Sequence, residues 1–194
     1  MTRRMIAIVG LMAAGSGAWY AAAAQVFTIG AHGVAVTHIE VDENLRATGI
    51  GYGAMFRLRL GRLALEGVGY RASMDSDDGA LIPFTLLEGN VRLLYEVTPM
   101  VAAEVGFIHR AVDPEFAAQD VGSFTVGLRA KNQLTRIAAI QVRAAYFVAP
   151  RFSGGGTAPV AFDLGLGTMI GPDNGHWRLH FAYDFQRLDR QVND

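Results

Sequence analysis

The residues best suited to acid–base chemistry lie near the end of the chain, where Arg178, His180 and Asp184 alternate with apolar residues. A histidine beside a carboxylate can act as a general base, but hydrolytic chemistry also needs a nucleophile within its reach. No histidine in the chain is followed two positions later by serine; the residues found there are Val34, Glu40, Ala111, Arg178 and Ala182. We therefore expect no catalytic residues and no enzyme activity, and we interpret His180 as a member of a structural charge network.

Metal and nucleotide sites are also not predicted. The acidic segment Asp75–Gly79 resembles the start of a calcium loop, but its fifth position would be Gly79 and its twelfth Leu86 rather than glutamate. His32 and His38 do not have the spacing of a ligand set. The three glycines at 154–156 lack the lysine and the following helix of a phosphate loop. We expect no metal and no cofactor.

Composition excludes further classes. The chain of 194 residues has no cysteine, which excludes disulfides and thiolate metal sites. The formal net charge of −1 offers no basic surface for nucleic acid. The remaining chemistry is ion pairing between opposite charges that alternate with apolar residues. We predict that these charges form one network, which consists of Arg57, Arg59, Glu88, Arg92, Glu96, Glu104, Arg129, Lys131, Arg143, Asp163, Arg178, His180 and Asp184.

The segments that must position these charges show a period of two. Between Ile50 and Leu60 every second residue is apolar, and the residues between them are glycine, methionine and arginine. Such alternation is typical of a β-strand whose two faces meet different surroundings. The same pattern recurs along the chain and predicts nine strands, at about 26–39, 47–60, 62–74, 83–97, 99–111, 122–133, 135–148, 159–170 and 176–187.

The predicted connections and strand number have two consequences. Tight turns at 61–62, 98–99 and 134–135 alternate with longer loops, as in an outer-membrane barrel. Glu66 and Arg71 have opposite parity in one strand, which predicts a bulge or an exposed end there. An odd strand number is unusual for a bacterial barrel. We therefore favour eight strands, with the first segment outside the wall, and ten is the alternative.

The N-terminus has the order of a secretory signal peptide. Arg3 and Arg4 precede an uncharged apolar stretch, and Ala21–Ala24 supplies small residues before Gln25. We predict a signal peptide at 1–24, cleaved near Ala24, and one barrel domain at 25–194. The alternative is a retained anchor, because the stretch from Met5 to Ala24 is long enough to cross a bilayer. Later apolar runs are interrupted by charges well before about 18 residues.

A membrane barrel is favoured over a soluble one for two reasons. The apolar faces extend for about ten residues, the length that a tilted strand needs to cross a bilayer. The polar faces carry glycines and opposed charges, which suit a narrow lumen. Tyr95, Phe107, Phe147 and Trp177 lie toward strand ends and are expected in an interfacial girdle.

Two segments then carry a resemblance. The stretch from Gly49 to Leu58, followed by a short turn and Leu63–Arg71, resembles a hairpin of the small outer-membrane β-barrel superfamily of the OmpA/OmpX type. The segment Leu179–Phe185 is similar to the closing strand of that family, although the chain continues nine residues further. The resemblance implies an all-β, antiparallel, up-and-down transmembrane barrel in a Gram-negative outer membrane. The His-x-Ser pattern of lipid A deacylase barrels is absent.

The sequence thus predicts an outer-membrane barrel with a structural or surface-interaction role, whose lumen is closed by the charge network. An eight-stranded barrel is just wide enough for side chains to fill, which favours a plug over an open channel. The alternatives are a narrow, porin-like pore for small solutes, a lipid-modifying enzyme, and a soluble β domain anchored to the inner membrane as a subunit of a complex. Expected partners are membrane lipids, lipopolysaccharide and other envelope proteins.

Overall fold

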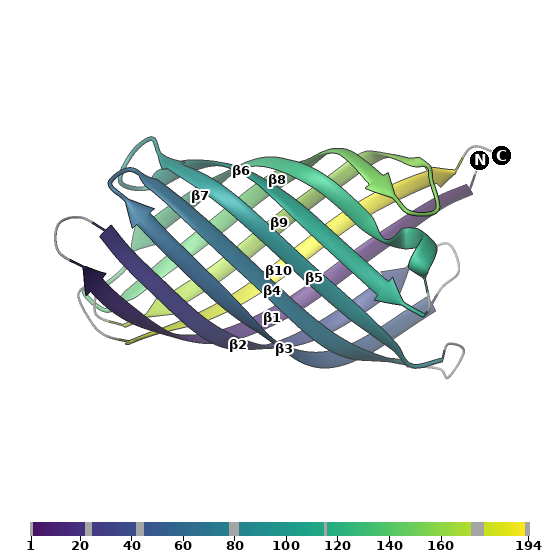
Figure 1. Ribbon diagram of the computed structural model, residues 1–194, viewed down its shortest axis with the longest axis horizontal. Coiled ribbons are helices and arrows are strands. Elements are labelled where there is room, and N and C mark those ends of the chain that lie inside the picture. Colours follow the sequence, from purple (N-terminus) through teal and green to yellow (C-terminus); the bar gives the residue numbers. More distant parts are fainter. Residues whose placement is uncertain are drawn as a thin grey trace.

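The wall of the molecule is a closed antiparallel barrel, and the computed structural model describes it at residues 2–21, 25–41, 45–77, 82–114, 116–171 and 177–192. Within these ranges there are ten strands, and each pairs with its neighbours in the sequence (Figure 1). The ring closes where the first strand pairs with the last. The same ranges contain no helix with the length and apolar character needed to cross a membrane.

The strands are long and run up and down in chain order. They are β1 Thr2–Ala21, β2 Gln25–Glu40, β3 Leu45–Leu60, β4 Leu63–Ser76, β5 Phe84–Glu96, β6 Val101–Asp113, β7 Val121–Gln133, β8 Ala138–Phe152, β9 Thr157–Ile170 and β10 Trp177–Val192. A short 3₁₀ helix, η1 (Ala117–Gln119), lies in the loop between β6 and β7. The register shifts once between β7 and β8 and once near the end of β10.

The predicted up-and-down barrel is confirmed, and its strand number is the alternative of ten rather than the favoured eight. All nine predicted strands are present as β2 to β10. The tenth, β1, is formed by residues that the sequence analysis assigned to a signal peptide, so they were left out of its strand count. The predicted cleavage point at Ala24 lies outside the described residues. Cleavage itself stays a prediction.

The two faces of the wall differ as the alternation predicts. Apolar side chains project outward and are strongly exposed, with Ile50 at 78% and Tyr52 at 73%. Their neighbours in sequence point into the barrel, where charged side chains such as Glu104, Arg110 and Asp163 are almost completely buried. A polar lumen inside an apolar outer surface is the reverse of a soluble protein and matches a barrel surrounded by lipid.

Predictions about single positions need correction. For the fourth strand the prediction was a bulge or an exposed end, and the bulge is absent because β4 pairs with β3 and β5 without a register shift. Glu66 points into the lumen and Arg71 outward, which opposite parity in a regular strand requires. Phe147 is not part of an outer girdle, because its neighbours Tyr146 and Val148 face outward and it is fully buried inside the barrel.

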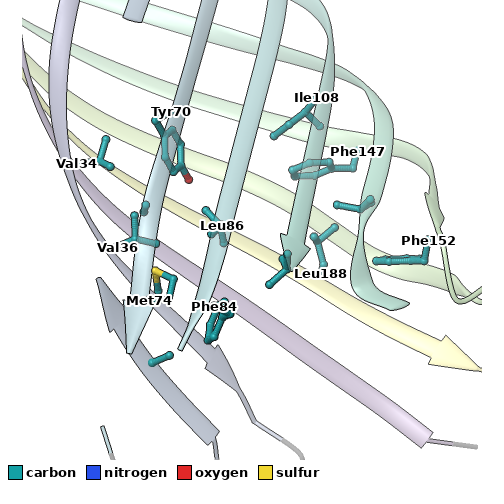
Figure 2. Packing of buried hydrophobic residues seen from close by; sticks show 14 of the residues in the cluster. Val34, Val36, Tyr70, Met74, Phe84, Leu86, Ile108, Phe147, Phe152 and Leu188 are labelled. Atoms are coloured by element: carbon teal, nitrogen blue, oxygen red, sulfur yellow. The ribbon is translucent and has the colours of Figure 1, made fainter. Parts of the chain in front are cut away.

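The lumen is divided along its length. Both termini and η1 lie at one rim, on the right in Figure 1, which we call the terminal rim. Behind this rim the lumen contains an apolar cluster that includes Met74, Phe84, Leu86, Phe147 and Leu188 (Figure 2). The hairpins β3–β4, β5–β6 and β7–β8 turn at the opposite rim, which we call the hairpin rim. Charged side chains fill the central part of the lumen between the two.

Candidate functional site: the lumen

The centre of the lumen is organised around Arg143 of β8. Its Nη2 lies 2.7 Å from Oδ2 of Asp163 on β9 and 3.1 Å from Oδ1 of Asp184 on β10. Its Nη1 lies 3.7 Å from Oε1 of Glu104 on β6. One guanidinium therefore contacts carboxylates from three strands, which is the geometry that its planar, multiply donating group allows.

The network continues across the barrel through Arg129 of β7. This side chain donates to Oε2 of Glu104 at 3.0 Å and to Oε2 of Glu66 at 2.6 Å. Nη1 of Arg57 lies 3.2 Å from the other oxygen of Glu66. Ion pairs thus connect β3, β4, β6, β7, β8, β9 and β10, so that the network spans the lumen from wall to wall.

A second cluster lies between the ionic network and the apolar cluster. Arg110 donates to Oε2 of Glu88 through Nε at 3.1 Å and Nη2 at 2.8 Å. Gln186 donates to Oε1 of Glu88 at 3.2 Å and accepts from Arg110. All three side chains are buried. Burying a charge without a partner costs several kcal/mol, so paired and hydrogen-bonded ions are expected at this depth.

The structure thus brings together part of the predicted set and adds members to it. Glu66 and Arg110 were absent from that set. The alternation of the strand placed Arg110 on the polar face, because it lies six residues from Glu104, but Arg110 was not included in the predicted network. Glu66 was missed because Arg71, on the same strand, has the opposite parity and obscured which face is polar.

Other predicted members lie toward the hairpin rim and are less enclosed. Arg59 and Glu96 form a 2.7 Å pair whose arginine side chain is 46% exposed. Lys131 is half-buried. Arg92, Arg178 and His180 line a cavity of about 140 Å³ together with members of the central network. The predicted set is therefore one connected centre, one separate rim pair and several cavity-lining groups.

The terminal rim is covered by the loop that contains η1. The Phe116 ring lies 5.2 Å from the His38 ring and 5.6 Å from the Phe84 ring, measured between centroids. Gln119 donates to Oε1 of Glu40 at 2.7 Å, and Val112 N donates to Asp120 at 2.7 Å. These contacts hold the loop across the apolar cluster. Sequence reasoning placed this segment in an exposed loop and had no signal for its position in the mouth of the barrel.

The Nε2 atom of His180 is buried and has no hydrogen-bond partner among the described residues, so these residues form no catalytic pair through it. In the same ranges, no group of three or more His, Asp or Glu side chains is arranged to hold a metal ion. The chemistry that the lumen supports is ion pairing and the binding of charged groups.

Glycine at 165 makes room for the central ion pairs. A Cβ added there would lie 2.6 Å from Oδ1 of Asp184 and 3.4 Å from Nε of Arg143. We expect Gly165→Val to destabilise the barrel by about 1–3 kcal/mol, the usual cost of overpacking. Denaturant unfolding in detergent micelles measures this cost.

Gly89→Val is the matched control for that substitution. Gly89 also lies within a strand, but a Cβ added there meets no atom within 4 Å. Valine favours strands over glycine, so this variant should be as stable as the parent protein or slightly more stable. Equal losses of stability in both variants would contradict the proposed close approach at Gly165.

Comparison with known proteins yields fold similarity only. No protein-family model matches the sequence, and no curated protein matches it. Among solved structures, the barrel is similar to the transport unit of the autotransporter AIDA-I from Escherichia coli, at 12% identity and a TM-score of 0.45, over 99% of this chain and 91% of that one. It is also similar to the translocator domain of the autotransporter NalP from Neisseria meningitidis, at 13% identity and a TM-score of 0.40, over 96% and 88%. Likeness at this level implies no shared activity, and the fold follows from the strand pairing itself.

Proposed function

We propose that the chain is an outer-membrane β-barrel with a structural or surface-interaction role and a lumen that does not conduct. One observation carries this proposal: an apolar outer surface surrounds a lumen that is filled with ion pairs and covered at one end. A closed barrel satisfies all backbone hydrogen bonds within its wall, which is the requirement for crossing a bilayer with strands. The proposal is non-enzymatic because, in the described part of the chain, no hydroxyl group forms a hydrogen bond with Nε2 of His180.

The outer surface supports the membrane location. Leucine, valine, isoleucine, phenylalanine and tyrosine side chains project from the described strands and are exposed; examples are Leu128, Leu166 and Phe124. Tyr95 and Trp177 also face outward near strand ends, where aromatic rings favour the membrane interface. Phe107, which the sequence placed near a strand end, faces outward at the middle of β6 instead. In water, so much contiguous apolar surface would cause aggregation. A surrounding bilayer removes that liability.

Basic groups on the outer surface favour membrane lipids and lipopolysaccharide as partners. Arg71, His109 and Arg151 are exposed on the outward face of β4, β6 and β8, and each lies toward the terminal rim of its strand. His109 and Arg151 both pair with Gly122 of β7, which has no side chain to separate them. Cationic side chains toward the terminal rim are suited to bind the phosphate groups of anionic lipids. Loops at the same rim are available to other envelope proteins.

Heat-modifiable gel mobility tests the barrel and its location. The protein, extracted from outer-membrane fractions in mild detergent, is expected to migrate faster before boiling than after it, because a folded barrel resists unfolding. The sample without detergent extraction should stay with the membrane pellet. A protein that is released by salt washing and shows no shift on boiling would indicate the anchored soluble domain instead.

N-terminal processing is tested on the same material. We propose cleavage near Ala24, so the mature chain should begin at Gln25. Because β1 is antiparallel to both β2 and β10, these two strands are parallel to each other. Removal of β1 therefore requires β2 and β10 to close the wall as a parallel pair. Intact-mass measurement gives the answer, and a chain that retains Met1 would keep β1 in the wall and refute processing.

Single-channel recording separates a closed lumen from the narrow pore. The apolar cluster and the Phe116 loop cover the terminal rim, and a dry apolar constriction excludes ions. We expect no steady conductance in planar bilayers. The variant Phe84→Ala with Phe116→Ala removes two rings packed at this mouth and should produce brief openings. Steady currents from the unmodified protein would favour the pore.

A further inference from the structure

One arginine that lines the cavity in the lumen has no partner in the described ion-pair network. Arg92 on β5 lines this cavity, and among the described residues no side chain forms a hydrogen bond or ion pair with it. Its opposite neighbour on β4 is Glu66. One oxygen of Glu66 is bound by Arg57 and the other by Arg129, at 3.2 and 2.6 Å. The carboxylate opposite Arg92 is thus already bound by two other arginines.

The other neighbours of Arg92 do not compensate its charge. On β6 it faces Gly106, which has no side chain. Two carboxylates, Asp163 and Glu104, attract the guanidinium, and two guanidinium groups, Arg143 and Arg129, repel it. Both carboxylates already form short ion pairs, at 2.7 Å with Arg143 and 3.0 Å with Arg129. Attraction and repulsion from these described groups oppose each other, so they leave the positive charge of Arg92 uncompensated. A cation that is screened from bulk water and has no partner is costly, and an anion bound beside it removes that cost.

Further polar groups are available beside Arg92. The Nε2 atoms of His32 and His180 and the Oδ1 atom of Asn90 are buried and have no hydrogen-bond partner in the described part of the chain. All three residues line the same cavity. A neutral imidazole can donate a hydrogen bond from Nε2, whereas the asparagine Oδ1 atom only accepts. A cavity with a free guanidinium and unused donors is suited to oxygen atoms that carry negative charge.

We propose that the cavity binds one small oxyanion of the phosphate or carboxylate class, held by the fork of the Arg92 guanidinium. The paired donors of arginine match two oxygens of such an anion. The volume of about 140 Å³ exceeds the roughly 30 Å³ share of one water molecule several times, so a hydrated oxyanion fits. This inference concerns the lumen alone and is independent of the proposed membrane role.

Titration with inorganic phosphate tests the site in the full-length folded barrel in detergent. Isothermal titration calorimetry at constant ionic strength should show saturable binding of one phosphate per chain. Arg92→Gln should weaken it about tenfold or more, because a charge-assisted hydrogen bond is lost. Arg59→Gln is the matched control, since it removes a lumen-side arginine at the rim that is paired with Glu96; its affinity should equal that of the parent protein.

Two further measurements keep the proposal testable if Arg92→Gln fails to fold. Asn90→Asp adds a carboxylate two residues from Arg92 on the same face and should abolish phosphate binding. Glycerol phosphate compares a free anion with a lipid headgroup, and it should bind no more tightly than phosphate, because the proposed contacts are made to the oxyanion alone. Absence of saturable binding, equal losses in Arg59→Gln and Arg92→Gln, or tighter binding of glycerol phosphate would each overturn the proposal.

Discussion

Replacing Arg143 with methionine is expected to destabilise the barrel by about 3–5 kcal/mol, the typical cost of breaking a buried ion pair. Arg143 contacts Glu104, Asp163 and Asp184, and two of these carboxylates are almost completely buried. Methionine has a similar length but leaves these carboxylates without their shared cation. They must then stay charged without compensation or take up protons, and both states are less stable than the ion-paired one.

Denaturant titration in detergent micelles measures this effect. Tryptophan fluorescence reports unfolding, through Trp177 in the proposed mature chain. Arg59→Met is the control, because the Arg59–Glu96 pair is partly exposed at the rim and such pairs contribute only about 0–1 kcal/mol. Comparable losses from both substitutions would show that the central network does not hold the wall together.

Arg143→Lys distinguishes charge from geometry. Lysine keeps the positive charge but presents one compact ammonium group instead of a planar fork. It is expected to recover part of the stability that methionine loses, because three carboxylates on three strands cannot all be reached from a single nitrogen. Full recovery would assign the effect to charge alone.

The second large effect is expected on the outer surface. Leu128 lies near the middle of β7, projects outward with 59% exposure, and is flanked by Ala103 and Ala144 on the neighbouring strands. If this surface faces lipid, Leu128→Arg should reduce the stability of the barrel folded in lipid vesicles by about 2–4 kcal/mol, the cost of arginine at the bilayer midplane. Refolding into vesicles over a denaturant series gives this value.

Asn132→Arg is the matched control on the same strand and the same face. Asn132 is exposed near the hairpin rim, where arginine reaches the interface and costs about 0–1 kcal/mol. A large difference between the two positions requires a depth-dependent apolar surrounding. Equal and small effects would contradict a membrane-facing wall and favour the anchored soluble domain.

The sequence by itself determined the fold class and the polarity of the two faces. A period of two is a local property, because consecutive side chains of a strand must point in opposite directions. The alternation from Ile50 to Leu60 therefore indicated an outer and an inner face without knowledge of any neighbour. The same local rule assigned Glu104, Arg143 and Asp163 to one face.

Where local patterns compete, the sequence was insufficient. The first residues have the order of a signal peptide, and the same residues pair along β1 with β2 and β10. Strand pairing requires only backbone groups that are available for hydrogen bonds. The composition of this segment is therefore compatible both with a cleaved signal peptide and with a strand of the wall. On β4, Glu66 and Arg71 are both charged, and only the regular register with β3 and β5 decided which of them faces the lumen.

Only the tertiary structure decided which charges meet. Arg143 reaches Asp163 on the adjacent β9 but also Glu104 on β6, two strands away in the ring. Such contacts depend on barrel width and on the tilt of the strands, which are properties of the closed ring. The same closure encloses Phe147 and the Phe116 loop, and it places Arg92 in the cavity with no ion-pair partner among the described residues. Side-chain alternation is local and can be predicted from the sequence, whereas contacts between side chains across the lumen form only when the ring closes.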